Sequence, residues 1–369
     1  MKRDRIHSAG PSITAKEIET VMDAIQNGWY SNYRHYLERF EKEFAEYVGV
    51  RHAIATTSCT TALHLGVATL GLKEGDEVIL PDLTWVATAS VLIYEGVKPV
   101  TVDIDPDSWT IDPDAVRKAI TPRTRAIMPV DLYGHPCDYD EIMKIAVEHG
   151  LKVLSDAAPA VGSLYKGKST AAYPNIACYS FQGAKMMVTG EGGMLVTNDD
   201  ELFERAAFLA EDGRDESKKT FWIQEIGYHY KIANLLAALG VAQLERVEEL
   251  VAMKRKQFDM YYERLGHVPG IKMFREKEGC RANCAYPSLL LEGEFPVNRD
   301  ELRKRLRERK IDTRPLFPPL SEFDMFDDAD TPVAKRIAGT GINLPTPAYL
   351  DQDDVDYICG AILEILEVK

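Results

Sequence analysis

The stretch that decides the fold of this chain is Tyr179-Ser-Phe-Gln-Gly-Ala-Lys185, which is followed by Thr189-Gly-Glu-Gly-Gly193. The neighbours of Lys185 are apolar or very small, whereas a solvated surface lysine is usually flanked by polar residues. Upstream, the apolar run Val153-Leu-Ser155 ends in Asp156 and two alanines. A lysine beside glycine-rich backbone, with an acidic residue at the end of a strand, indicates a reactive amine in a binding or catalytic site.

These residue types have the parts needed to hold pyridoxal phosphate (PLP). The amine of Lys185 can form a Schiff base with the aldehyde, and the Ser180 hydroxyl and nearby backbone N–H groups can bind the phosphate. The carboxylate of Asp156 can keep the ring nitrogen protonated, so that the ring acts as an electron sink. Asp156 could also be a plain N-cap after a strand, but its pairing with Lys185 favours the role at the ring.

Short apolar runs alternate with helical patterns on both sides of this stretch. This alternation predicts an α/β fold with a mainly parallel sheet covered by helices on both faces. Ligands of such sheets bind at the carboxyl ends of the strands, which is where Asp156 falls. The expected strands are residues 77–80, 97–102, 126–131 and 152–155, and the expected helices are residues 15–26, 37–48 and 60–70.

The C-terminal part has a different pattern. Residues 234–253 predict one long amphipathic helix that joins a large domain, residues 1–250, to a smaller α+β domain, residues 251–369. Residues 276–283 are polar and predict a loop, and the charged run 298–309 predicts a solvated helix. The apolar side of the long helix is expected to contain Leu235, Leu239, Val241, Leu244, Val247 and Leu250.

Composition restricts the class of protein. The chain has 369 residues, a net charge of −14 and a hydrophobic content of 45%. This acidic balance argues against a nucleic-acid partner, although a few local donors could still bind an anionic substrate. The N-terminus lacks the apolar core of a signal peptide, and no apolar run approaches eighteen residues. We therefore expect a cytoplasmic protein without a membrane partner.

Six scattered cysteines do not form a disulfide pattern in a chain of this length. Cys280 and Cys284 make a single CxxxC pair without a second pair or flanking histidines. Reduced thiols in a loop are therefore expected, and no metal site.

Several segments in order resemble the DegT/DnrJ/EryC1/StrS family of PLP-dependent nucleotide-sugar aminotransferases. The lysine segment is joined by a phosphate turn, an aromatic segment, a glycine-tyrosine segment and a C-terminal signature, and the match covers roughly residues 6–365. These further segments are Ser58-Cys-Thr-Thr-Ala-Leu-His64, Thr84-Trp-Val-Ala-Thr-Ala89, Gly227-Tyr-His-Tyr-Lys-Ile-Ala-Asn234 and Gly341-Ile-Asn-Leu-Pro345. The resemblance implies an aspartate-aminotransferase-like fold, fold type I of the PLP enzymes.

The resemblance also assigns cofactor contacts. Ser58, Cys59 and Thr60 would form the phosphate turn at a helix N-terminus, where free N–H groups and the helix dipole favour an anion. Thr60 could instead be a plain N-cap, and Cys59, where the family usually has glycine, could be a small filler. Trp85 would stack on the cofactor ring, or it could be a core residue.

Other residues are implied at the substrate and at a subunit boundary. Asn234 and Lys231 resemble residues that reach the cofactor phosphate or the substrate from the neighbouring subunit, which would make a homodimer with composite active sites. A helix cap for Asn234 and a surface charge for Lys231 are the alternatives. Arg314 resembles a residue near the substrate, where it could bind a sugar or phosphate oxygen. Tyr133 is expected to shape the floor of the site.

Two departures from the family pattern concern the substrate. After Asp156-Ala-Ala158 the family usually has Glu, Gln or His, which in many members bonds the phenolic oxygen of the cofactor. Here Pro159 stands in that place and cannot make this bond. Phe317-Pro-Pro-Leu-Ser321 also lacks a histidine that many 4-aminotransferases carry there.

The resemblance implies amino transfer, with glutamate as the expected donor, to C4 of a nucleotide-linked keto-deoxysugar, as in perosamine-synthase-like enzymes. Lys185 would move the proton between the donor and the cofactor. The alternatives are amination at C3 or of another keto sugar or cyclitol, and a non-catalytic regulatory or binding protein of the same fold. A PLP-dependent sugar dehydratase is disfavoured, because such enzymes have histidine in place of Lys185.

Overall fold

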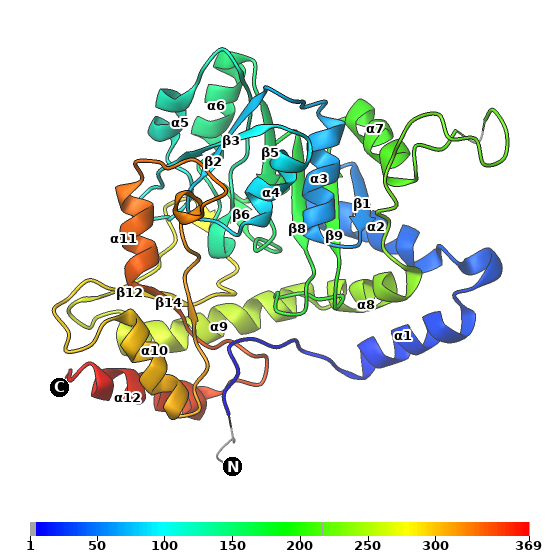
Figure 1. The fold of residues 1–369 in the computed structure, drawn as a ribbon. Coiled ribbons are helices and arrows are strands. Elements are labelled where there is room, and N and C mark those ends of the chain that lie inside the picture. The colour runs from blue at the N-terminus through cyan, green and yellow to red at the C-terminus, as the bar shows by residue number, and fades with distance from the viewer. Residues whose placement is uncertain (1–4, 216, 369) are drawn as a thin grey trace.

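The computed structural model describes residues 5–215 and 217–368 and is built around a seven-stranded sheet (Figure 1). The strand order is β1-β9-β8-β5-β4-β2-β3, and β3, β2, β4, β5 and β8 run parallel, while β9 is antiparallel to both of its neighbours. The mainly parallel sheet predicted from the sequence is confirmed. The strands are β1 (His52–Thr56), β2 (Glu77–Pro81), β3 (Lys98–Val102), β4 (Thr124–Ile127), β5 (Lys152–Asp156), β8 (Ile176–Ser180) and β9 (Gly193–Thr197).

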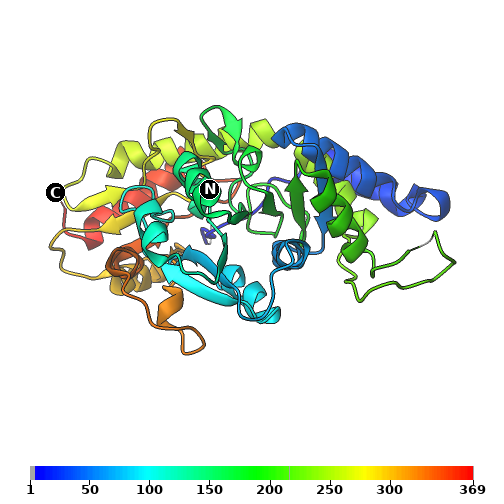
Figure 2. The same cartoon turned by 90° about the horizontal axis from the view of Figure 1, so that it is seen from above.

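Helices lie on both sides of this sheet (Figure 2). The helix α2 is packed against the β8–β9 part, and α3 against the opposite side of the same strands. The helices are α1 (Ala15–Asn27), α2 (His35–Val48), α3 (Cys59–Thr69), α4 (Ala87–Tyr94), α5 (Pro113–Ala119), α6 (Tyr139–His149), α7 (Asp200–Ala210), α8 (Asn234–Leu244) and α9 (Val247–Leu265). No helix within the described residues has the length and apolar character needed to cross a bilayer.

A second, antiparallel sheet lies in the C-terminal part, with helices beside it (Figure 1). Its strands, in spatial order, are β10 (Ile271–Met273), β12 (Ser288–Leu291), β14 (Gly341–Asn343) and β13 (Arg314–Pro315). Its helices are α10 (Arg299–Glu308), α11 (Pro332–Thr340) and α12 (Gln352–Ile365). A small third sheet joins the two parts and contains β6 (Leu164–Tyr165), β7 (Lys168–Ser169) and β11 (Cys280–Arg281).

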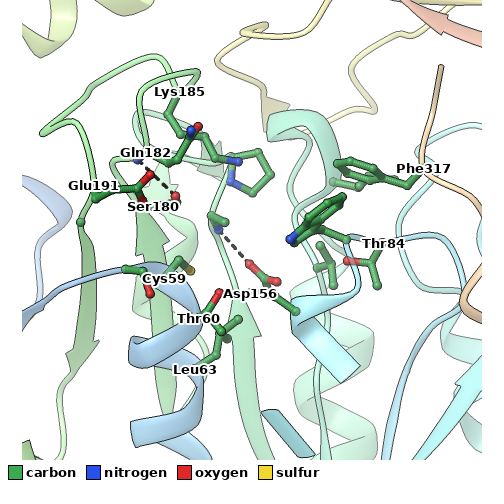
Figure 3. A pocket seen from close by; sticks show the side chains of 18 residues that line it. Cys59, Thr60, Leu63, Thr84, Asp156, Ser180, Gln182, Lys185, Glu191 and Phe317 are labelled. Atoms are coloured by element: carbon green, nitrogen blue, oxygen red, sulfur yellow. Dashed lines mark hydrogen bonds between the residues drawn. The ribbon is translucent and has the colours of Figure 1, made fainter. Parts of the chain in front are cut away.

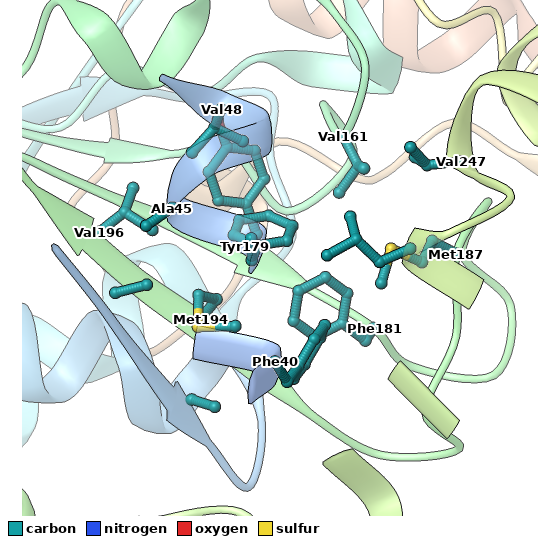
Figure 4. Packing of buried hydrophobic residues seen from close by; sticks show 14 of the residues in the cluster. Phe40, Ala45, Val48, Val161, Tyr179, Phe181, Met187, Met194, Val196 and Val247 are labelled. Atoms are coloured by element: carbon teal, nitrogen blue, oxygen red, sulfur yellow. The ribbon is translucent and has the colours of Figure 1, made fainter. Parts of the chain in front are cut away.

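The core under the lysine segment is aromatic. Phe40 and Phe44 of α2 pack against Tyr179 and Phe181 of the β8 segment, with ring centroids 5.1 to 5.3 Å apart (Figure 4). Burying each ring is worth roughly 1.5–3 kcal/mol, so this cluster fixes the strand that leads to the lysine. On α8, a Cβ at Gly240 would come within 2.7 Å of the Phe40 ring, so glycine is required for this close approach.

The predicted helix over residues 234–253 is wrong as a single helix. The chain leaves helical geometry at Arg246 (φ −114°, ψ 8°), so α8 ends before α9 begins. Leu235, expected on the apolar side, is exposed. At this position the Arg246 side chain pairs with Glu17 and Glu249, at 2.6 and 2.7 Å.

Other sequence expectations also need correction. The strand β3 is an edge strand with little burial, as Pro99 at the sheet edge suggests, rather than a buried one. The region 276–283 contains β11 and ends in the fully buried Asn283, whose Nδ2 donates to the Pro159 carbonyl at 2.6 Å. The charged helix expected at 298–309 is confirmed as α10.

The division near residue 250 stays a prediction. The helix α9 contributes Val247 and Val251 to the core of the large sheet, and Tyr261 and Leu265 to the core of the C-terminal sheet. At the other end of the chain, Ile6 pairs with Ile311 and belongs to the C-terminal core. The expectation about a leader rests partly on residues 1–4, which lie outside the described residues.

Glu17 makes the attachment of α1 to α8 dependent on pH. Burial raises its pKa, but bonds from Thr14, Arg246 and Gln243 outweigh this and lower the pKa to about 2. Because the folded-state pKa is below the ordinary value, the stabilisation is complete above pH 4.5 and is lost as the pH falls toward 2. We expect Glu17→Gln to remove on the order of 2–3 kcal/mol of this pH-dependent stability, measured by urea unfolding between pH 3 and 7. The exposed Glu19→Gln on the same helix is the control, and an equal pH dependence in both variants would contradict the assignment.

Candidate active site

Two parallel neighbours in the sheet bring the main candidate residues together. Asp156 is the last residue of β5 and pairs with Cys178 of β8, two residues before Ser180. The loop from β8 to β9 carries Lys185. All three side chains therefore lie at the carboxyl end of the parallel strands, the edge at which sheets of this kind bind ligands.

The lysine loop is held by its own backbone. Gly183 N–H donates to the Gly190 carbonyl at 2.9 Å, Lys185 N–H to Gln182 at 2.8 Å, and Thr189 N–H to Phe181 at 2.8 Å. These bonds fix the loop between two strands and leave the Lys185 side chain pointing over the carboxyl end of the sheet (Figure 3).

The N-terminus of α3 lies beside this loop. Ser58 is its N-cap and accepts the N–H of Thr61 at 3.1 Å, so the helix starts at Cys59, one residue before the predicted start at Thr60. Gly193 of β9 lies against this helix end, and a Cβ there would come within 2.4 Å of the Ser58 carbonyl carbon. Glycine therefore allows β9 and the N-terminus of α3 to form one continuous cradle.

Asp156 is buried but hydrogen-bonded. Its Oδ2 accepts the Thr88 hydroxyl at 2.8 Å, and its Oδ1 accepts the Ala158 N–H at 3.1 Å. Burial raises the pKa of Asp156, and these two bonds only partly offset it. A cation in the cavity would stabilise the ionised carboxylate, which is what a protonated ring nitrogen provides.

These elements enclose a cavity of about 400 Å³ (Figure 3). This volume is within the ordinary range for a small-molecule site. Seven residues singled out in the sequence line it, namely Ser58, Cys59, Thr60, Trp85, Asp156, Ser180 and Lys185. The Cys59 thiol is neutral there, since burial raises its pKa well above the ordinary range.

Aromatic side chains form one wall of the cavity. Trp85 is exposed on the cavity side, and its ring centroid lies 5.5 Å from that of Phe317. Tyr133 lies behind Phe317 rather than on the cavity surface, with ring centroids 5.6 Å apart in a stacked arrangement. Its hydroxyl accepts the Phe317 N–H at 3.2 Å. Tyr133 thus supports the wall, while Trp85 is free to stack on a ligand.

Besides Tyr133, three expected site residues do not line this cavity within their own chain. Lys231 is held by Glu41 at 2.9 Å, and by Glu211 at 3.7 Å. Asn234 accepts the N–H groups of Tyr36 and Leu37, at 2.8 and 3.2 Å, and so caps α2. Arg314 is exposed, with Asp312 at 3.7 Å.

The cavity also contains residues that the sequence reasoning did not assign. Gln182, Glu191 and Phe317 line it, and Pro159 lies at its edge with Asp156. Thr88 bonds Asp156 but was not predicted at the site. It lies in the first turn of α4, and Thr84 lies just before that helix. Their Oγ1 atoms are 2.9 Å apart.

The residues present fit PLP. The N-terminal turn of α3 lines the cavity together with Ser180, and the first N–H groups of a helix lack intrahelical partners, so an anionic phosphate could bind there. Asp156 lies opposite as the ring-nitrogen partner, Trp85 offers a stacking face, and Lys185 offers the amine. Within residues 5–215 and 217–368, no cluster of His, Cys, Asp and Glu has the makings of a metal site.

The comparisons with known proteins agree with this fit. The chain is 38% identical over 367 residues to the GDP-perosamine synthase of Caulobacter vibrioides, covering 98% of each chain. It is 35% identical over 326 residues to a UDP-2-acetamido-2-deoxy-3-oxo-D-glucuronate aminotransferase of Pseudomonas aeruginosa, covering 87% of this chain and 88% of the other. The putative sugar aminotransferase Spr1654 of Streptococcus pneumoniae, solved in its PMP form, superposes with a TM-score of 0.93 at 26% identity, covering 98% of each chain.

The match to a known family extends over residues 11–363. The parallel sheet, the lysine loop and the cradle at α3 all lie within this range. This chain belongs to the DegT/DnrJ/EryC1/StrS aminotransferase family and is an aminotransferase of fold type I that uses PLP.

Proposed function

We propose that this enzyme transfers an amino group from glutamate to the keto carbon of a nucleotide-linked deoxysugar, and that this carbon is C4. The observation that carries the proposal is the meeting of Lys185, Asp156 and the α3 N-terminus in one cavity. The similarity to GDP-perosamine synthase supports a nucleotide-linked sugar as the acceptor. PLP supplies an electron sink that makes the Cα proton of the donor removable.

Each protein group has a defined role in this proposal. Lys185 would hold the cofactor through its amine and, when that amine is free, would move a proton at the donor Cα. Asp156 holds the proton on the ring nitrogen. Ser180 and the N-terminal turn of α3, including Ser58, Cys59 and Thr60, bind the phosphate, and Trp85 orients the ring by stacking.

The charge of the cavity supports a site completed by a second subunit. Among the described residues that line it, Lys185 is the one Lys or Arg, whereas Asp156 and Glu191 are carboxylates. The cofactor phosphate, a nucleoside diphosphate and a dicarboxylic donor all add negative charge. Further cations are therefore needed, and an isologous homodimer could supply them to both sites.

Exposed apolar side chains support the same conclusion. Ile18, Met22 and Ile25 share the outer face of α1, and large side chains follow at Trp29 and Tyr30. Beyond α7, the segment that contains Phe221 and Ile226 projects from the body of the chain (Figure 1). Exposed apolar surface of this extent is typical of a protein interface.

Complementation tests the composite site. We expect Lys185→Ala and Asn234→Ala homodimers each to lose activity, and verified heterodimers of the two to recover some, because one site then has both intact residues. The bonds of Asn234 to α2 mean that its variant must first be checked for folding by circular dichroism. If folded heterodimers stay inactive, Asn234 is only the cap of α2 in its own chain. A native mass corresponding to a monomer would contradict the dimer itself.

The acceptor is tested with keto-sugar nucleotides that differ in carbonyl position and in the nucleotide. The enzyme, converted to its amino form with glutamate, should lose that form's absorbance fastest with a 4-keto-6-deoxyhexose linked to GDP. Formation of 2-oxoglutarate and of the amino sugar is followed by mass spectrometry. Amination at C3 is the second candidate, because the Pseudomonas aeruginosa relative is named for a 3-oxo sugar. A faster reaction with the 3-keto isomer would contradict amination at C4 and favour amination at C3.

Arg314 and Lys231 keep lesser roles in this proposal. Arg314 is exposed at the start of β13, where its guanidinium is available to a sugar or phosphate oxygen of a bound nucleotide. Lys231 has a structural role in its own chain through Glu41, so we assign it to the substrate only if the second subunit displaces that pairing.

A further inference from the structure

Four aromatic rings form a continuous row from the lysine to the stacking tryptophan. The ring centroids of Tyr286 and Tyr133 are 5.8 Å apart, those of Tyr133 and Phe317 are 5.6 Å apart, and those of Phe317 and Trp85 are 5.5 Å apart. The row therefore joins the C-terminal part of the chain, which provides Tyr286 and Phe317, to the wall of the cofactor cavity.

Tyr286 lies at the lysine end of this row. The Nζ of Lys185 lies 5.7 Å from the centroid of its ring, within the range of a cation–π contact. The backbone of Tyr286 is fixed, because its carbonyl accepts the Ser288 hydroxyl at 2.9 Å and Ser288 begins β12. The ring is half-buried and packs against two of the hydrophobic cores.

During the proposed reaction the Lys185 amine is released from the cofactor and must bind it again. A contact such as that with the Tyr286 ring would keep the released amine near the cofactor. The lysine side chain has about 2 kcal/mol of rotamer entropy, so a free amine would spend most of its time away from the reacting carbon. We infer that Tyr286 is a positioning residue for Lys185, and that its ring holds the amine over the cavity and favours the charged form of that nitrogen. The inference rests on the proposed role of Lys185 as the cofactor-bearing residue.

The hydroxyl of Tyr286 also acts on Lys185, besides the ring contact. Burial lowers the pKa of Lys185, but the charge and hydrogen bonding of the Tyr286 hydroxyl, together with Cys59 and Asp156, outweigh that effect and raise the pKa above its ordinary value. Tyr286 belongs to the C-terminal part of the chain, so any rearrangement of that part relative to the large sheet changes the position of the lysine.

The test uses the pH dependence of visible absorbance in the PLP-loaded enzyme, which reports protonation of the lysine–cofactor linkage. We expect Tyr286→Leu to lower the pKa of this linkage by roughly half a unit to one unit, because a cation–π contact is worth about 0.5–1 kcal/mol or more. Tyr286→Phe keeps the ring but loses the hydroxyl, so its pKa should fall less than that of Tyr286→Leu. We expect kcat of the Leu variant to fall roughly two- to fivefold with little change in KM for the donor.

Tyr262→Leu is the matched control. Tyr262 also contacts a cation, with the Arg275 guanidinium carbon 4.7 Å from its ring centroid, but it lies on α9 outside the cavity. An unchanged pKa in Tyr286→Leu would overturn the inference. A shift in Tyr286→Phe as large as in Tyr286→Leu would also overturn it, since the hydroxyl and not the ring would then act. If wild type shows no lysine-linked cofactor at all, the role of Lys185 fails instead.

Discussion

Lys185→Ala is expected to abolish attachment of the cofactor and to reduce amino transfer by at least about 10³-fold, while the chain still folds. The amine both anchors PLP and moves the proton, and general acid–base catalysis alone contributes 10²–10⁴-fold. The loss of the visible band measures the anchoring, and single-turnover conversion of glutamate measures the proton transfer. Far-ultraviolet circular dichroism and the midpoint of thermal unfolding check the fold.

Lys144→Ala is the control for this experiment. Lys144 is an exposed lysine on α6 that pairs with Glu141 at 3.5 Å, so its removal should leave absorbance and rate unchanged. A Lys185→Ala protein that transaminates at close to the wild-type rate would mean that another amine does this work.

Asp156→Asn is expected to keep the cofactor on Lys185 but to lower kcat by about 10²–10³-fold. A neutral amide cannot hold the ring proton, and loss of one preorganised electrostatic group in a closed site costs about 2.7–4 kcal/mol. The side chain keeps its size and can still accept from Thr88, so the fold should survive. Steady-state kinetics and the absorbance band separate the two effects.

Asp140→Asn, a change of the same kind on the surface of α6, should have no effect on the rate. If Asp156→Asn stays within about twofold of wild type, the ring nitrogen has another partner. Thr88→Val should give a smaller loss than Asp156→Asn, because it removes only one of the two donors to the carboxylate.

The central part of the site could be predicted because it depends on local sequence. Lys185 lies on one loop between adjacent strands, and Asp156 ends the neighbouring parallel strand, so the rule for parallel sheets places both at one edge. The segment Ser58-Cys59-Thr60 was identified through the resemblance, and the structure places it at the N-terminus of α3 in the lining of the same cavity. The position of the N-cap, Ser58 instead of Thr60, shows the usual limit at element boundaries.

Contacts between segments that are distant in the sequence could not be predicted from local sequence patterns. Arg246, at the break between α8 and α9, pairs with Glu17, a residue more than two hundred positions away. The pairing of Ile6 with Ile311, and the antiparallel direction of β9, are likewise tertiary outcomes that hydrophobic periodicity does not encode. Asn283 was assigned to a loop because its neighbours are polar, but it is buried to hold the carbonyl of Pro159.

The residues contributed by other parts of the molecule were the hardest to find. Tyr286 lies in a bend before β12, and only the packing of the C-terminal part onto the lysine loop brings it to Lys185. The side chains of Lys231 and Asn234 were identified by resemblance, and in their own chain they are engaged elsewhere. Their roles in a second subunit depend on an assembly that one chain's sequence pattern does not describe.

The most direct measurement is reduction of the PLP-loaded enzyme with borohydride, followed by peptide mapping by mass spectrometry. The account predicts one phosphopyridoxyl group per chain, on the peptide that contains Lys185 and on no other lysine. A label on a different lysine, or a loaded enzyme without any reducible linkage, would contradict the assignment of this cavity as the site of amino transfer.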